Sequence, residues 1–94
     1  MPEMKAVRAV VRGRVQGVGF RYSTVDQANR HGVTGWVRNM PSGRVEVFVQ
    51  GPDVNVDRLL AWLAIGPRLA SVTGIEVVSA EPDAGLSTFR IRFD

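Results

Sequence analysis

The fold is organised around the stretch GRVQGVGFR at residues 13–21, which places three glycines between a segment with strand periodicity and one with helical periodicity. Glycine accepts positive φ angles and lets a bound group approach the main chain, so the stretch predicts a loop whose N–H groups converge on a ligand. Arg21 then falls in the first turn of a helix, where the partial positive charge of the helix end favours an anion. The positive charge of Arg21 is therefore unfavourable at this helix end. A phosphate bound between Arg21 and the loop would offset both positive charges, so we interpret the stretch as an anion-binding loop.

Other phosphate-binding motifs do not fit this loop. No Gly-Lys-Ser/Thr follows it, which excludes a Walker A sequence, and Tyr22 stands where a dinucleotide fingerprint needs glycine or alanine. The stretch predicts instead a short nest of main-chain N–H groups around a phosphoryl group, with the Arg21 guanidinium binding two of its oxygens. These N–H groups belong to Gln16, Gly17, Val18, Gly19 and Phe20. A tight strand-to-helix turn without a ligand explains the same glycines about equally well.

The segments next to the loop have clear periodicities. Residues 5–14 alternate between apolar and mostly basic side chains, which is typical of a half-buried strand. Residues 21–31 predict a helix that Gly32 ends. Residues 34–40 and 44–50 then flank a Pro-Ser-Gly turn and predict a β-hairpin.

The rest of the chain adds one helix and two strands. Apolar residues recur at helical spacing over 56–64, and Gly66-Pro67 stops that helix; residues 71–80 and 89–93 predict strands. The resulting order, β-α-β-β-α-β with a terminal strand, predicts an α+β ferredoxin-like split β-α-β sandwich with two helices on one face of a mostly antiparallel sheet. We expect the 94 residues to form a single domain with its core over about residues 5–93.

Composition excludes several kinds of site. The chain has no cysteine, which rules out disulfides, thiolate nucleophiles and cysteine metal sites, and no apolar run approaches the length of a membrane span. We therefore expect a cytoplasmic protein. A net charge of +3, from eleven arginines and one lysine against nine acidic residues, permits contact with phosphates without requiring nucleic acid. The single histidine, His31, lies at a predicted helix end, where a role in helix stability is favoured over catalysis.

Asn39 is a second candidate site residue, at the end of the strand predicted over 34–40. Asparagine commonly initiates a turn at such a place by folding back on its own backbone. The predicted topology offers another interpretation, because the first strand pairs with the third and the second lies beyond the third. The end of the second strand can then lie near the loop after the first. Asn39 would there offer a carbonyl oxygen and an amide donor to a water beside the bound phosphorus.

The sequence resembles the acylphosphatase family over nearly its whole length, from about Lys5 to Phe93. The family's signatures correspond to GRVQGVGFR at 13–21, GWVRN at 35–39 and Gly-x-Val-Glu at 43–46. Smaller matches occur at 50–51, 62–63, 66–67 and 89–92. The chain departs from many members at Met40 and Ser42, which leaves Arg21 and Asn39 unaffected and bears on the rate of turnover rather than on the type of reaction.

The resemblance implies a small hydrolase, without metal or other cofactor, that cleaves the carboxyl–phosphate bond of acyl phosphates to a carboxylate and inorganic phosphate. It implies that Arg21 binds the substrate phosphate and that Asn39 holds the attacking water. Phosphoryl transfer needs in-line positioning and charge stabilisation more than a covalent nucleophile, which suits these residues. The expected partners are an acyl phosphate and, as product and inhibitor, inorganic phosphate. We expect a monomer with no membrane or nucleic-acid partner.

Two alternatives remain at this point. The same fold occurs in RNA-binding domains whose sheet aromatics stack on bases. We expect the present sheet to lack an aromatic pair in the glycine-phenylalanine context of those domains, since Gly19-Phe20 lies in the loop, and we interpret Trp36 and Trp62 as core or helix-packing aromatics. The strand arginines are interpreted as solvated faces; they are Arg8, Arg12, Arg14, Arg90 and Arg92. The second alternative is the N-terminal part of a larger carbamoyl-transfer protein. Because the chain ends directly after the last predicted strand, we expect a free-standing enzyme.

Overall fold

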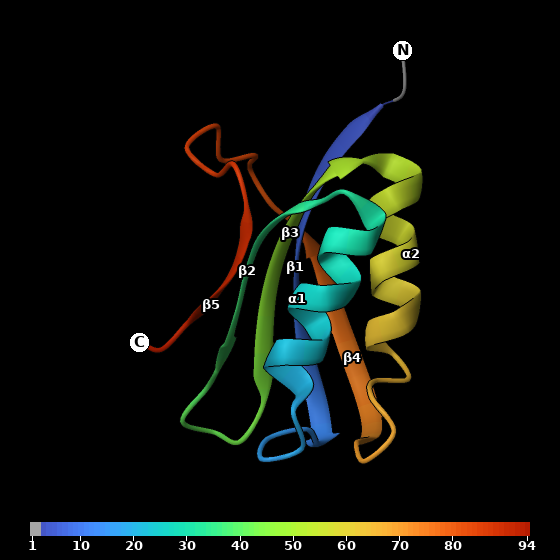
Figure 1. Cartoon of the computed structure of the whole chain (residues 1–94), viewed down its shortest axis with the longest axis vertical. Helices are drawn as coiled ribbons and strands as arrows, with labels where there is room; N and C mark the ends of the chain where they lie inside the picture. The colour runs from blue at the N-terminus through green and yellow to red at the C-terminus, as the bar shows by residue number, and fades with distance from the viewer. Residues whose placement is uncertain (1–2) are drawn as a thin grey trace.

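The computed structural model describes residues 3–94 and shows a five-stranded sheet with two helices packed on one of its faces (Figure 1). Along the chain the elements are β1 (Met4–Arg14), α1 (Phe20–His31), β2 (Thr34–Asn39), β3 (Val45–Pro52), α2 (Asp53–Leu63), β4 (Ser71–Ser79) and β5 (Phe89–Arg92). Every helix and strand expected from the periodicity is present, with bounds that differ by one to three residues.

The strand order is β4-β1-β3-β2-β5. The pairs β1–β3, β1–β4 and β2–β3 are antiparallel and β2–β5 is parallel, which confirms the ferredoxin-like α+β fold. Because β1 and β2 both run antiparallel to β3, they point the same way. The loop after β1 and the turn after β2 therefore emerge at the same end of the sheet, the lower end in Figure 1.

The core lies between the sheet and the helices. The apolar side of β1, predicted from its alternation, is buried, and the valines of β3 that face the same way are fully enclosed. The helices complete this core with Phe20 and Ala28 from α1 and Val56, Leu59 and Leu63 from α2. Burying one such large aliphatic or aromatic side chain contributes about 1.5–3 kcal/mol, so the core fixes how α1 and its preceding loop sit on the sheet.

The face of the sheet away from the helices is partly covered by its own side chains. Phe48 of β3 is only 6% exposed there, because Trp36 of β2 stacks on it with ring centroids 6.1 Å apart. The Arg92 guanidinium lies over the other side of Trp36, 4.5 Å from the ring centroid. The expectation that Trp36 packs in the core or on a helix is thus wrong, whereas Trp62 does pack against Phe20, at 5.7 Å.

Gly13 has a different role from the other two glycines of its stretch. It belongs to β1, where the register with β4 shifts between Arg12 and Gly13. A Cβ at Gly13 would overlap the main-chain carbonyl of Ser71 on β4. Gly13 is therefore required for the close approach of two strands, and only Gly17 and Gly19 belong to the loop itself.

Candidate active site

The loop between β1 and α1 has the backbone conformation that its glycines predict. Gly17 and Gly19 have φ angles of 74° and 75°, in the left-handed region that side chains disfavour, and Gly19 forms the N-cap of α1. A Cβ added at either position would meet no atom within 4 Å. The two glycines are therefore needed for their φ angles, and the space beside them is open to a ligand.

The N–H groups of this loop have no protein acceptors. Among residues 3–94, none of the main-chain N–H groups of residues 16–20 donates a hydrogen bond, and the first bond of α1 runs from Ser23 N to Gly19 O at 3.0 Å. No side chain caps α1, and its first turn contains no acidic residue. A helix N-terminus with such free donors and a positive dipole end is suited to binding an anion.

Arg21 lies one residue into α1 and adds a full positive charge to this helix end. No carboxylate within the described residues forms an ion pair with it. Its guanidinium instead lies over the ring of Phe93, with Cζ 5.3 Å from the ring centroid. Phe93 is 78% exposed, so the contact leaves the charge of Arg21 near solvent and available to a ligand.

Asn39 is the last residue of β2 and pairs with Val45 of β3. Its side-chain Oδ1 is buried, and within residues 3–94 it accepts no hydrogen bond. Leaving a buried amide oxygen without a donor costs about 1–3 kcal/mol. The carbonyl oxygen of Asn39 is thus an acceptor in need of a donor, whereas the loop after β1 offers donors in need of an acceptor.

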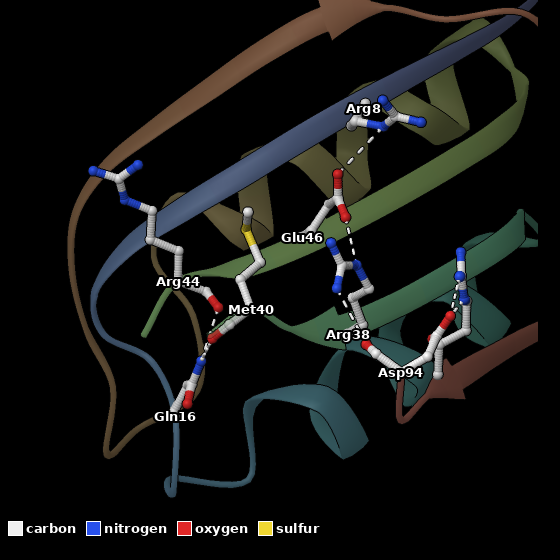
Figure 2. A network of polar contacts seen from close by, with 8 residues as sticks. Arg8, Gln16, Arg38, Met40, Arg44, Glu46 and Asp94 are labelled. Carbon is white, nitrogen blue, oxygen red and sulfur yellow. Dashed lines mark hydrogen bonds and ion pairs between the residues drawn. The ribbon is translucent and has the colours of Figure 1, made fainter. Parts of the chain in front are cut away.

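The side chain of Gln16 connects these two parts of the site (Figure 2). Its Nε2 donates to the carbonyl oxygens of Met40, at 2.8 Å, and Arg44, at 2.9 Å, which lie in the turn directly after Asn39. Sequence reasoning gave Gln16 a main-chain role only. A hydrogen bond from a side chain to carbonyls 24 and 28 residues away leaves no pattern in the sequence, so no signal could have revealed it.

A second network, on the open face of the sheet, fixes the end of the chain near Arg21 (Figure 2). Glu46 accepts a hydrogen bond from Arg38 Nε at 2.6 Å and pairs with Arg8 Nε at 3.4 Å. Arg38 Nη1 in turn donates to the main-chain oxygen of Asp94 at 3.1 Å. The hydrogen bond from Arg92 lowers the pKa of the Asp94 carboxyl. Because both neighbours of residue 93 are held, its ring has a defined place over Arg21.

Other polar features lie away from this end. His31 ends α1, at the opposite end of the helix from Arg21, and within residues 3–94 no three His, Asp or Glu side chains are grouped to hold a metal. A pocket of about 400 Å³ is lined by residues such as Met4, Gly51 and Pro82 and contains neither Arg21 nor Asn39. No helix in the described part of the chain is long and apolar enough to cross a membrane.

Comparisons with known proteins point to one family. A family model described as Acylphosphatase matches residues 7–91. A curated acylphosphatase of Anaeromyxobacter dehalogenans is 48% identical over 93 residues, which span 99% of this chain and 100% of that protein. The crystal structure of acylphosphatase from Bacillus subtilis superposes with a TM-score of 0.89 and 34% identity, covering 96% of this chain and 99% of that one.

A similar fold also occurs inside a much longer protein. Full-length HypF, in its phosphate- and nucleotide-bound form, contains a region that superposes with a TM-score of 0.87 and 27% identity. That region covers 98% of this chain but only 12% of HypF. The present fold therefore occurs both as nearly the whole of a chain and as a small part of one.

Proposed function

The chain belongs to the acylphosphatase family, and on that premise we propose that it hydrolyses the carboxyl–phosphate bond of acyl phosphates by direct in-line attack of a water molecule. The proposal is supported by one observation: hydrogen-bond donors and an acceptor that lack protein partners lie at the same end of the molecule. Free N–H donors lie on the loop after β1, and Arg21, which forms no ion pair within the described residues, lies in the first turn of α1. Gln16 joins that loop to the turn beside the unpaired acceptor of Asn39.

The phosphate of the substrate is held by the loop after β1. The N–H groups of residues 16–20 surround its oxygens, and the Arg21 guanidinium binds two of them. The open donors and the open space beside Gly17 and Gly19 support this assignment. The substrate anion also offsets the unfavourable interaction between the charge of Arg21 and the positive end of the α1 dipole.

The attacking water is held by Asn39. A small rotation of the Asn39 amide would expose the buried Oδ1, and water would then donate one hydrogen to it and turn a lone pair of its own oxygen toward phosphorus. The new bond forms between the water oxygen and phosphorus while the bond from phosphorus to the acyl oxygen breaks, and its electron pair leaves with the carboxylate. The proton of the water passes to an oxygen of the substrate phosphate, so no histidine base is required.

Charge stabilisation comes from Arg21 and the N–H donors, and we propose that no metal ion takes part. Aligned donors and a guanidinium around a transferring phosphoryl group supply the kind of electrostatic stabilisation that such reactions need. Because a carboxylate is a good leaving group, little further activation is needed. Hydrolysis is then expected to be insensitive to a chelator.

The RNA-binding alternative lacks a free stacking surface. Trp36 and Phe48 do form an aromatic pair on the open face of the sheet, as such modules require. However, one side of Trp36 is covered by Phe48 and the other by Arg92, and Phe48 is itself buried. A base could stack there only after Arg92 had moved, so the aromatic pair serves packing.

The proposal is tested by measuring hydrolysis of benzoyl phosphate with and without a chelator. Arg21→Ala and Asn39→Ala should each lower kcat/KM by about 10³-fold or more, because one removes the phosphate clamp and the other the acceptor for water. Arg30→Ala and Asn29→Ala are matched controls, since both residues are exposed at the far end of α1, and these variants should keep wild-type rates.

Inorganic phosphate should inhibit the wild type competitively and fail to inhibit Arg21→Ala. Circular dichroism of each variant should remain that of the wild type. Unaltered turnover in Asn39→Ala would remove the role given to Asn39, and a loss of activity on chelation would remove the metal-free mechanism.

A further inference from the structure

We propose that the side chain of Gln16 is a positioning residue that fixes Asn39 relative to the bound phosphate. This inference rests on the proposed function. Gln16 contributes to both halves of the site: its main-chain N–H belongs to the phosphate-binding loop, and its side-chain amide is bound to the turn after Asn39. The side chain therefore sets the separation between the group that binds phosphorus and the group that holds water.

The two hydrogen bonds of Gln16 hold the turn at its first and last residues, Met40 and Arg44. The carbonyls that it binds also take part in the turn's own hydrogen bonds, from Met40 N to Arg44 O at 2.8 Å and from Gly43 N to Met40 O at 3.1 Å. Both hydrogens of the Gln16 amide are thus used. Within the described residues, Gln16 is the only side chain from outside residues 40–44 that donates to this turn.

These hydrogen bonds matter because the rest of the turn is exposed to solvent. Residues 41–44 are all solvent-exposed, and Asn39 is joined to them directly through Met40. A turn held only by its own hydrogen bonds can shift relative to the loop after β1, and a misplacement of about 1 Å at a reacting centre can cost about 10²-fold in rate. The Gln16 amide restricts that shift without touching the substrate.

The chemistry of the contact requires an amide of this length. Two carbonyl oxygens face the side chain, so a carboxylate in its place would have no hydrogen to donate and would meet two acceptors. Asparagine carries the same donors on a side chain that is one methylene shorter. Methionine has a similar length without donors and therefore removes the hydrogen bonds while keeping the bulk.

If Gln16 has this role, substituting its side chain should lower the turnover rate without weakening the binding of phosphate. In Gln16→Met the main-chain donors and Arg21 remain, so the inhibition constant of inorganic phosphate should stay within about threefold of wild type, while kcat for benzoyl phosphate should fall about 10- to 100-fold. Gln16→Glu should lose at least as much in kcat. Gln27→Met, on the partly buried side of α1, is the matched control and should leave both quantities unchanged.

A double-mutant cycle tests whether Gln16 acts through Asn39. If it does, Gln16→Met in an Asn39→Ala background should lower kcat no further. Multiplication of the two losses, an unchanged kcat in Gln16→Met, or a rise in the phosphate inhibition constant equal to the loss in kcat would each overturn the inference. If Asn39→Ala is too slow to measure, the separation of kcat from phosphate binding decides alone.

The outcomes distinguish this inference from the proposed function. Full activity of Asn39→Ala would contradict the proposed function itself. A strongly impaired Asn39→Ala beside a fully active Gln16→Met would leave the proposed function intact and remove the role of Gln16. Should Gln16→Met fold poorly, Gln16→Asn provides the comparison, because it keeps the neutral amide on a side chain that is one methylene shorter and adds no charge beside the phosphate.

Discussion

The two helices begin in opposite ways. α2 starts after Pro52 with Asp53 in its first turn, and Lys5 Nζ pairs with the carboxylates of Asp53, at 3.1 Å, and Asp57, at 2.5 Å. The Asp53 N–H donates to the carbonyl of Glu3 at 2.7 Å. Neither helix has a side-chain cap, but α1 starts after a left-handed glycine, has no acidic residue in its first turn and carries Arg21 there.

Under the proposed function, this difference separates a helix start that serves stability from one that binds a ligand. An acidic residue at a helix N-terminus contributes about 0.3–1 kcal/mol, and a basic residue there is unfavourable by a similar amount. α2 satisfies this rule with Asp53, whereas α1 breaks it with Arg21. We infer that the electrostatic balance of α1 is completed only when an anion binds.

The largest test of this contrast reverses the charge at each helix start. Arg21→Glu should lower kcat/KM for benzoyl phosphate by more than about 10³-fold, because a carboxylate would repel the substrate phosphate. Its free energy of unfolding should not fall, since the acidic residue suits the helix dipole and offsets the lost contact with Phe93. Activity assays and urea unfolding on the same preparation measure both quantities.

Asp53→Lys is the matched reversal at α2. It removes a favourable charge from the helix start and one of the two partners of Lys5, so the protein should lose about 1 kcal/mol of stability and keep its wild-type hydrolysis rate. The two variants should thus show opposite patterns. A fall in activity at Asp53 comparable to that at Arg21 would mean that the contrast reflects general helix stability.

Phosphate should stabilise one helix start and not the other. At a concentration of about 100 times its dissociation constant, a ligand that binds only the native state raises the free energy of unfolding by about 2.7 kcal/mol. We expect thermal unfolding in phosphate, compared with chloride at equal ionic strength, to show this gain in the wild type and Asp53→Lys. Arg21→Glu should show none, and a gain there would place the anion elsewhere.

A smaller effect is expected at the two ends of α1 itself. Gly19 before the helix and Gly32 after it both have left-handed φ angles, 75° and 65°. Replacing either by alanine should cost about 1–2 kcal/mol in stability from backbone strain. Only Gly19→Ala should also reduce hydrolysis, about tenfold, because its methyl group projects into space that no protein atom occupies within 4 Å. Equal activity of the two variants would show that this space is not used by substrate.

How far the sequence could predict this site depends on whether a signal is local. The alternation of β1, the glycines at 17 and 19 and the position of Arg21 are local properties, and the structure agrees with the predicted fold and loop conformation. Gly13 is predicted from the sequence as part of the anion-binding loop, and that prediction is wrong. Glycine is needed there because the main-chain carbonyl of Ser71, on a strand 58 residues later, leaves no room for a Cβ. The local pattern could not distinguish a strand contact from a ligand contact.

Contacts across strands were predicted less well for the same reason. Trp36 is in a short strand whose pattern gives no reason to expect an aromatic on the helix-free face, and its cover comes from Phe48 and Arg92 on two other strands. The hydrogen bonds of Gln16 reach main-chain carbonyls, whose positions do not depend on residue type. Such contacts follow from topology and register, so they become visible only once the chain is folded.

The smallest expected effect concerns pH at the start of α2. Hydrogen bonds to Asp57 and Asp53 raise the pKa of Lys5 above its ordinary value of 10.5. A raised pKa in the folded state means that the ion pairs contribute fully below pH 10.5 and that their contribution is lost as the pH rises through the higher folded value. Lys5 is the single lysine of the chain, so its substitution removes the whole lysine contribution to this alkaline change. The unfolding midpoint of the wild type should therefore fall between about pH 10 and 12, and Lys5→Met should show a shallower fall. Because Lys5 is partly exposed and both of its carboxylate partners are accessible to solvent, the difference should be small and should shrink in high salt. A steep alkaline loss that persists in Lys5→Met would mean that α2 does not owe its stability at alkaline pH to this charge pairing.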